Sequence, residues 1–273
     1  MAPSTILNSL SEPLPRYPAD GLDALPDIQP SGSSTKETNP PKFWVMGRDW
    51  AASGVNAITA SRRRLVAAGL ETEFIYKKET AIKLLTEGDV TRAAALYLLH
   101  PVNQALSALN PDISCLSEHH GNTIRSDVTY KFGLDRAFAI VEFKKRGVIR
   151  MEEFRGALLE LNNDRARAQA QINDKIMSAM DERGMSFFRK NSLNLLKQAA
   201  NYAVKHGTNY VAMFDWNYLI LITFNFDTSP PVEDREINGA GDYCSIRVIE
   251  ENSPGMRKAL FAFLCAAAGL ITH

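Results

Sequence analysis

The chain has 273 residues, of which 45% are hydrophobic and 23% are charged, so it can bury a substantial core as one globular domain with an extra segment. Lys and Arg together number 31, and so do Asp and Glu, which excludes a global electrostatic footprint for nucleic acid and requires any such footprint to be local. The three cysteines are widely spaced without metal-ligand spacing, which favours buried free thiols in a reducing compartment.

The N-terminus lacks the features of a secretory signal, because no basic region leads into an apolar core and a small-residue cleavage site. We therefore expect an intracellular protein, nuclear or cytoplasmic. No apolar run approaches the length of a membrane span, and the nearest case, Ala259–Ile271, is too short and follows Arg257 and Lys258. We expect no membrane association.

Residues 1–41 hold most of the prolines and a Ser-rich tract at Ser31–Thr35, with little apolar periodicity. This composition predicts a disordered or loosely docked arm. Residues 42–273 are expected to form a single domain, with Phe43 and Trp44 as the place where the arm docks.

Helices are expected before the sheet. Thr59–Ala68 has a helical pattern, and its consecutive arginines, Arg62 to Arg64, are a solvated helix face, phosphate contacts or a nuclear import signal. Glu79–Leu99 carries an apolar stripe for one or two helices. After a break at Asn110–Asp112, Ile113–Glu118 is expected to be the first strand.

The chain is organised around a predicted β-hairpin at Thr123–Arg146. Thr123–Phe132 is rich in β-branched and aromatic residues, and Gly133–Asp135 supplies the turn. Ala137–Phe143 is an almost unbroken apolar run, as a central strand covered on both faces must be.

Charged side chains gather where this apolar strand ends. A turn near Leu134 places Asp127 across from Val141 or Glu142. Because side chains alternate along a strand, Glu142 and Lys144 share one face. Two carboxylates suit Mg²⁺ or Mn²⁺, and a nearby amine suits metal-assisted hydrolysis of a phosphodiester. The alternative is a solvated ion pair at the end of an amphipathic hairpin.

Two helical regions follow the hairpin. Residues 151–183 are highly charged and are expected to form a helical insertion of two helices divided at Asn162–Asp164. Its residues Arg165 and Arg167 line a substrate groove or face solvent. Ser192–His206 is expected to be a helix, capped by Ser192 and ended by Gly207.

The remaining strands complete a mixed sheet. Asn209–Phe214 and Tyr218–Phe224 are expected to form a hairpin, and Ser245–Ile249 a short edge strand. Pro254–Leu270 is expected to be a closing helix, with Ser253 as its cap. This apolar helix is a core element or the surface of a homodimer.

The residues Ser126-Asp127, followed by Glu142-Phe143-Lys144, resemble the PD-(D/E)XK motif of the restriction-endonuclease-like nuclease superfamily. Ser126 stands where that motif usually has Pro. Gln198 and Tyr202 share a helix face, and Gln-Ala-Ala-Asn-Tyr resembles the Gln-x-x-x-Tyr motif of RecB-type members. The resemblance covers about residues 79–224 and implies an α/β fold with a restriction-endonuclease-like core, a central mixed sheet flanked by helices.

The distance along the chain from Lys144 to Gln198 is longer than this resemblance leads us to expect. Residues 151–183 are therefore a substrate-selecting cap, or the motif helix is instead the one that carries Gln169 and Gln171. We keep the first interpretation. Superfamily members often add a carboxylate from the helix before the sheet, for which Glu79 and Glu87 are the candidates.

The resemblance implies a nuclease dependent on Mg²⁺ (or Mn²⁺) that hydrolyses phosphodiester bonds of nucleic acid, with DNA favoured over RNA. The alternative is a nuclease-fold protein that binds nucleic acid or a protein partner without cleavage. The implied roles are metal ligation by Asp127, Glu142 and the backbone carbonyl of Phe143, positioning or activation of water by Lys144, support of the site by Gln198 and Tyr202, and phosphate contacts by Lys145, Arg146 and Lys205.

Overall fold

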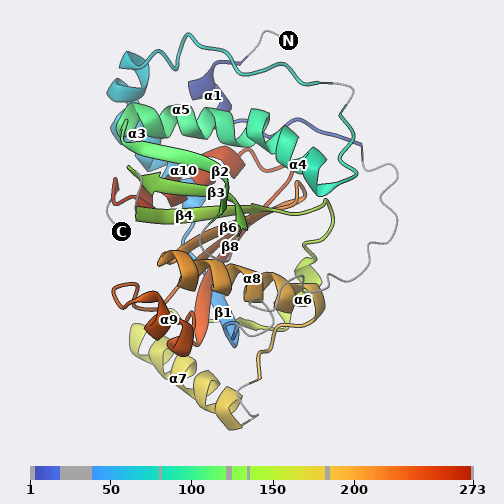
Figure 1. The fold of residues 1–273 in the computed structure, drawn as a ribbon, viewed down its shortest axis with the longest axis vertical. Helices are drawn as coiled ribbons and strands as arrows, with labels where there is room; N and C mark the ends of the chain where they lie inside the picture. Colours follow the sequence, from blue (N-terminus) through green and yellow to red (C-terminus); the bar gives the residue numbers. More distant parts are fainter. Residues whose placement is uncertain are drawn as a thin grey trace.

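A computed structural model describes residues 4–18, 39–79, 82–120, 125–133, 136–181 and 185–271. These residues form an α/β fold around an eight-stranded mixed sheet in the order β2-β3-β4-β6-β7-β8-β1-β5 (Figure 1). The strands are β1 (Phe43–Met46), β2 (Ile113–His120), β3 (Arg125–Phe132), β4 (Arg136–Phe143), β5 (Leu158–Leu159), β6 (Tyr210–Phe214), β7 (Tyr218–Phe224) and β8 (Tyr243–Glu250). The expected central mixed sheet flanked by helices is confirmed.

Helices cover both faces of this sheet. They are α1 (Ile6–Ser9), α3 (Trp50–Ala67), α4 (Glu87–Ala94), the π-helix η1 (Ala95–Leu99), α5 (His100–Leu109), α6 (Met151–Arg155), α7 (Arg165–Asp181), α8 (Lys190–His206), α9 (Val232–Asn238) and α10 (Met256–Ala267). Figure 1 shows α3, α5 and α10 on one side of the sheet and α8 and α9 on the other. Each side has its own buried core.

Side chains alternate along β4, so this one strand contributes residues to both cores. Val141 and Phe143 lie in the core beneath α5 and α10, whereas Ile140 lies in the core beneath α8. Glu142 has the parity of Ile140, so it faces α8. β4 pairs antiparallel with β3 and parallel with β6, and it is buried along nearly its whole length. The central strand of the expected hairpin is confirmed.

The hairpin turn is only partly described. Gly133 adopts φ +57, a left-handed conformation that glycine reaches without steric cost and that suits a turn. Leu134 and Asp135 lie outside the described residues, as do Thr123 and Ile124 at the start of the expected first arm.

The other end of the sheet differs from expectation. β8 is not an edge strand, because it pairs with β7 on one side and with β1 on the other. β1, which contains the expected docking residues Phe43 and Trp44, is itself a strand between β8 and β5. β5 interrupts the expected helical insertion, so residues 151–181 contain α6, β5 and α7 rather than two helices alone.

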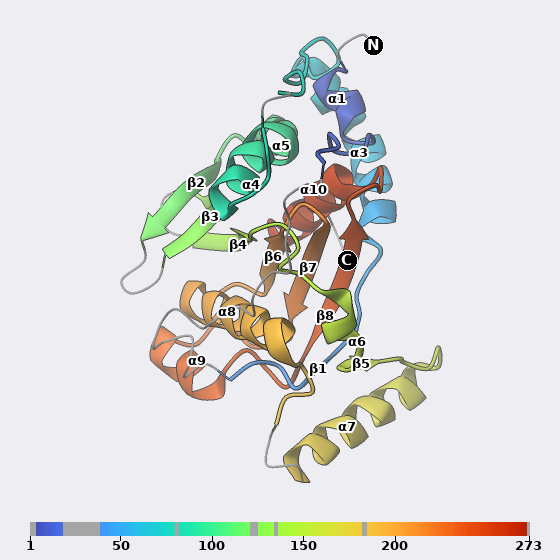
Figure 2. The ribbon, with the colours of Figure 1, turned by 90° about the vertical axis from the view of Figure 1, so that its right-hand side faces the viewer.

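Helix α7 lies apart from the main body, beside the β5 end of the sheet (Figure 2). Its Ile172 is buried against Phe43 and Val45 of β1, with Ile176 half-buried beside them. Arg165 and Arg167 are exposed at its N-terminal end, which favours the solvent-facing alternative over a groove in the fold. The closing helix α10 is buried along most of its length, so it is a core element.

The prediction of a disordered or loosely docked arm is wrong for residues 4–18. The apolar side chains of this N-terminal segment, Ile6, Leu7, Leu10, Leu14 and Tyr17, are at most 5% exposed and belong to the core under α5 and α10. The buried Arg257 of α10 donates to the Ser9 carbonyl at 2.9 Å and to the Tyr97 carbonyl. Residues 19–38 of the expected arm lie outside the described residues.

Two further expectations concern cysteines and membranes. Cys244 and Cys265 are buried free thiols as expected, whereas Cys115 on β2 is exposed. Within the described ranges, no helix has the length and apolar character needed to cross a membrane.

Candidate active site

The β3–β4 hairpin brings the two motif acids together. Val128 pairs with Val141, so Asp127 lies beside Glu142, one of the two positions expected for it. The Asp127 N–H donates to Glu142 Oε2 at 3.4 Å, and Asp127 Oδ2 accepts the N–H of Phe143 at 2.8 Å. The Asp127 carboxylate thus replaces a backbone partner at the end of β4 and is held next to Glu142.

Lys144 completes this cluster just beyond β4. Its Nζ lies 2.6 Å from Glu142 Oε1 and 3.8 Å from Glu87 Oε2. The Glu142 and Lys144 residues are only 4% and 8% exposed. Glu87, in the first turn of α4, is therefore the helix carboxylate near the cluster, whereas Glu79 forms an ion pair with Arg92.

Helix α8 supplies the amide that binds Glu142. Gln198 Nε2 donates to Glu142 Oε1 at 2.7 Å and to the Tyr202 hydroxyl at 2.8 Å. Their spacing of one turn places both side chains over β4, as expected. The helix ends at Gly207 with φ +63, also as expected, but Ser192 lies in the first turn and Arg189 is the N-cap. Gln198 thus connects the carboxylate to Tyr202.

The alternative motif helix does not reach the cluster. Gln169 and Gln171 lie on α7, which is well apart from β4 (Figure 2). Gln169 donates to Asn173, and Gln171 accepts the N–H of Asn162. The structure therefore favours Gln198 and Tyr202.

Burial changes how these groups titrate. It raises the pKa of Glu142 from 4.5 to about 7, although the Lys144 ammonium opposes the shift. Burial lowers the pKa of Lys144, but its attraction to Glu142 and Glu87 outweighs burial and leaves that pKa raised. Burial and the nearby Glu142 charge raise the pKa of Tyr202. At neutral pH Lys144 keeps its proton, Tyr202 stays neutral and Glu142 is close to its midpoint.

A cleft of about 600 Å³ opens beside this cluster, between α4 and the hairpin. Asp127 and Glu87 lie in its walls, so the two carboxylates are accessible from it. The rest of its lining consists of Gly88, Thr91, Arg92, Ala95, Leu99, Asn103, Cys115, Ser117, Val128 and Phe143. The cleft is large enough to admit part of a nucleotide chain.

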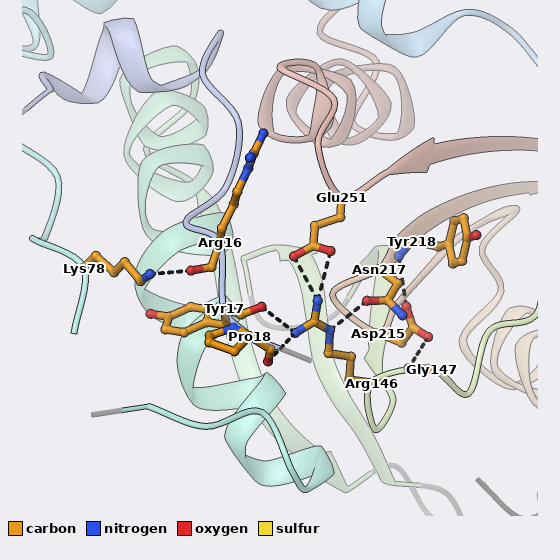
Figure 3. Close-up of polar contacts among 10 residues, drawn as sticks. All are labelled: Arg16, Tyr17, Pro18, Lys78, Arg146, Gly147, Asp215, Asn217, Tyr218 and Glu251. Atoms are coloured by element: carbon orange, nitrogen blue, oxygen red, sulfur yellow. Dashed lines mark hydrogen bonds and ion pairs between the residues drawn. The ribbon is translucent and has the colours of Figure 1, made fainter. Parts of the chain in front are cut away.

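The assignment of Arg146 to phosphate contact must be corrected. Arg146 is 4% exposed, and its donors are occupied within the protein (Figure 3). They bind Asn217 Oδ1 at 2.7 Å, the Tyr17 carbonyl at 2.9 Å and both carboxylate oxygens of Glu251 at 3.0 and 3.1 Å. Arg146 therefore anchors the N-terminal segment to the end of β4.

The other two basic candidates differ from each other. Lys145, directly after Lys144, is half-buried and stays a candidate for phosphate contact. Lys205 lies at the C-terminal end of α8 and forms an ion pair with Glu236 of α9. Its charge is already neutralised there, so it is the weaker candidate.

Asp215 is a buried acid beside the site that the sequence did not single out. Its carboxylate accepts the N–H groups of Gly147 at 3.0 Å, Ile149 at 2.9 Å and Tyr218 at 2.9 Å. Burial raises its pKa to about 7 against these hydrogen bonds. Asp215 ties the loop after Lys144 to the β6–β7 turn. The available signal in the sequence is its position directly after an apolar strand, in the connection of the expected hairpin.

The cluster offers few acidic side chains as ligands for a metal ion. Within the described part of the chain, no group of three or more His, Cys, Asp or Glu side chains is arranged to hold a metal. Mg²⁺, however, is commonly held by one or two carboxylates and keeps several waters. Asp127 and Glu142 supply such a pair of hard oxygen ligands, so the residues present fit Mg²⁺ or Mn²⁺.

Comparisons of the chain with protein-family models, with curated proteins and with solved structures found no match.

Proposed function

We propose that the protein is a metal-dependent nuclease that hydrolyses phosphodiester bonds, with DNA the favoured substrate. The observation that carries the proposal is the Glu142 carboxylate, which accepts the Asp127 N–H and the side-chain donors of Lys144 and Gln198, beside an open cleft that Asp127 lines. A restriction-endonuclease-like core is supported by the order of a helical region (α4 to α5), β2, β3, β4, α8 and β6, with α6, β5 and α7 inserted between β4 and α8.

In this proposal, Asp127 and Glu142 hold Mg²⁺ or Mn²⁺, and the Phe143 carbonyl is a further candidate ligand. When bound, the ion supplies Lewis-acid stabilisation of charge on the phosphate and a water of lowered pKa. Glu142 must lose its proton to act as a ligand, and a pKa of about 7 makes that loss inexpensive near neutral pH.

The remaining side chains act on orientation and charge. Lys144 carries a proton at neutral pH, so it serves as a hydrogen-bond donor that orients water and stabilises negative charge, rather than as a general base. Gln198 fixes Glu142 Oε1 through a 2.7 Å hydrogen bond. Tyr202, uncharged, holds the Gln198 amide in place.

Cleavage of plasmid and of single-stranded DNA with Mg²⁺ or Mn²⁺ tests the proposal. We expect activity that EDTA abolishes and that Lys144→Ala lowers by roughly two or more orders of magnitude. Asp127→Ala should abolish it, whereas Lys205→Ala should retain it, because Lys205 is already paired with Glu236 at the C-terminal end of α8. Circular dichroism would check that each variant is folded. A folded Lys144→Ala protein with full activity would contradict the assignment.

A second candidate is a nuclease-fold protein that binds nucleic acid without cutting it. The observation in its favour is that Glu142 Oε1 already accepts from both Lys144 and Gln198. Oligonucleotide binding with no cleavage under either metal would support this candidate, as would binding that Asp127→Ala leaves unchanged.

A further inference from the structure

A strip of exposed basic and aromatic side chains leads from the connection between α3 and α4 towards the candidate site. We define it as the approach strip, composed of Arg16, Phe74, Tyr76, Lys77 and Lys78. All five side chains are exposed. The N-terminal segment and the α3–α4 connection thus contribute to one surface.

The two aromatic rings of the strip are exposed to solvent. Ile75 is partly buried against the core, whereas its neighbours Phe74 and Tyr76 are 58% and 54% exposed. The centroid of the Tyr76 ring lies 5.1 Å from that of the His100 ring on α5. Phe74 forms an isolated antiparallel β-bridge with Thr5, and the Ile75 N–H donates to the Ser4 carbonyl at 3.0 Å. Exposed rings on a pinned backbone are suited to stacking with planar ligands.

The basic side chains lie next in the strip. Lys78 Nζ donates to the Arg16 carbonyl and lies 4.9 Å from the Tyr17 ring centroid, which holds Lys78 beside Arg16. Figure 3 shows the Arg16 side chain extending away from the Arg146 cluster. Among the described residues, no ion pair neutralises Arg16, Lys77 or Lys78. The strip therefore carries a local positive charge on a chain of net charge zero.

Two contacts connect the strip to the candidate site. The carbonyls of Tyr17 and Pro18, directly after Arg16, accept from Arg146 at 2.9 and 3.1 Å, and Arg146 lies two residues beyond Lys144. Glu79, directly after Lys78, pairs with Arg92, which lines the same cleft as Asp127. The residues that follow Arg16 and Lys78 in the chain thus contact Arg146 and Arg92, of which Arg92 lines the cleft.

We propose that the approach strip binds single-stranded nucleic acid and guides it into the cleft beside Asp127. Arg16, Lys77 and Lys78 contact phosphates, and Phe74 and Tyr76 stack on bases. Stacking on side chains requires bases that are free of a duplex, so the pairing of exposed rings with cations selects single strands. This inference deepens the proposed nuclease function, on which it rests, by naming the form of its substrate.

Fluorescence anisotropy of the full-length protein in EDTA tests binding separately from cleavage. The probes are a fluorescein-labelled oligo(dT) of about 20 nucleotides, long enough to cover the strip, and a duplex of the same length. We expect the wild-type protein to bind the single strand more tightly than the duplex. The double variant with Phe74→Ala and Tyr76→Ala should have a Kd for the single strand that is about tenfold higher or more.

The basic residues have a separate signature. Lys77→Ala with Lys78→Ala should weaken binding and reduce the slope of log affinity against log salt by about 1.4, which corresponds to two phosphate contacts on a single strand. Arg165→Ala with Arg167→Ala is the matched control, because it removes two exposed cations from α7 at the opposite end of the molecule. It should leave both the Kd and the slope unchanged.

Three results would overturn the inference. The first is a loss of binding in the α7 control as large as that in the strip variants. The second is tighter binding of the duplex than of the single strand. The third is binding to anionic phospholipid vesicles through the strip, with no binding to the oligonucleotide. Failure of the nuclease function has a different signature. In that case the strip variants weaken single-strand binding as expected, but the wild-type protein cleaves no DNA with Mg²⁺ or Mn²⁺.

Discussion

Glu142 is a buried carboxyl group beside a charged lysine, and its titration should make the free energy of unfolding depend on pH. Its pKa is about 7 in the folded state against an ordinary 4.5, so between these values the folded state binds more protons than the unfolded state. The free energy of unfolding then falls as pH rises through this window, by up to about 1.4 kcal/mol per pH unit. Lys144 contributes nothing there, because its raised pKa lies above the window.

We therefore expect Glu142→Gln to flatten the decline of stability between about pH 4.5 and 7. Part of the decline should remain in this variant, because the pKa of Asp215 is also raised, from 3.8 to about 7. Urea unfolding at a series of pH values would measure both proteins. A Glu142→Gln slope equal to that of the wild type would mean that Glu142 is ionised in the fold throughout.

Arg146 gives a second test at this scale. Arg146→Ala leaves Glu251 and two backbone carbonyls without their buried partner, so we expect a loss of about 3 kcal/mol or more in the free energy of unfolding. Arg155→Ala, at an exposed position on α6, should change it by less than about 0.5 kcal/mol. If Arg146 contacted phosphate instead, its substitution would weaken nucleic-acid binding and leave stability intact.

Among the secondary-structure elements, the N-terminal segment departs furthest from its sequence pattern. Leu10 is fully buried, so Leu10→Ala should destabilise the protein by about 2 to 5 kcal/mol. Leu85→Ala is the matched control, because Leu85 is 41% exposed and its truncation should cost less than about 0.5 kcal/mol. Thermal unfolding of the two variants would compare them. Equal melting temperatures would show that the segment is loosely attached after all.

Elements with a strong local pattern were predictable, and elements defined by a distant partner were not. Neighbouring residues in the sequence show the alternation in β3, the apolar run of β4 and the amphipathic face of α8. β5 has only two residues and exists because it pairs with β1. Likewise, Leu7 and Leu10 are too sparse among prolines to show periodicity, and they become core residues only because α5 and α10 cover them.

The same distinction applies to the candidate site. Strand alternation placed Glu142 and Lys144 on one face, and the hairpin register placed Asp127 across from Val141 or Glu142, of which the structure selects Glu142. The contact of Glu87 with Lys144 depends on how α4 packs. The burial of Arg146 depends on Tyr17, Asn217 and Glu251, which come from three separate parts of the chain. A charged residue after a strand therefore gives no sign in sequence of whether it faces solvent or the interior.

At the scale of the whole molecule, stability should be unevenly distributed. Helices α7 and α8 both contain 17 residues, but α8 buries an entire face, whereas α7 is held mainly through Ile172 and its neighbours. We expect the amides of α7 to exchange with solvent by local opening, well before those of α8 and α10. Hydrogen exchange followed by mass spectrometry would measure this. Equal protection of α7 and α8 would contradict it.

The position of β1 between β8 and β5 bears on how the protein is made. Trp44 pairs with Cys244 on one side and with Leu158 on the other. A nascent chain emerging from the ribosome therefore carries β1 long before its neighbour β8 has been translated. The sheet cannot be completed until β8, which ends at Glu250, has been translated, and such distant pairings form slowly. Until then β1 can pair only with β5, and its hydrogen-bonding edge towards β8 stays open.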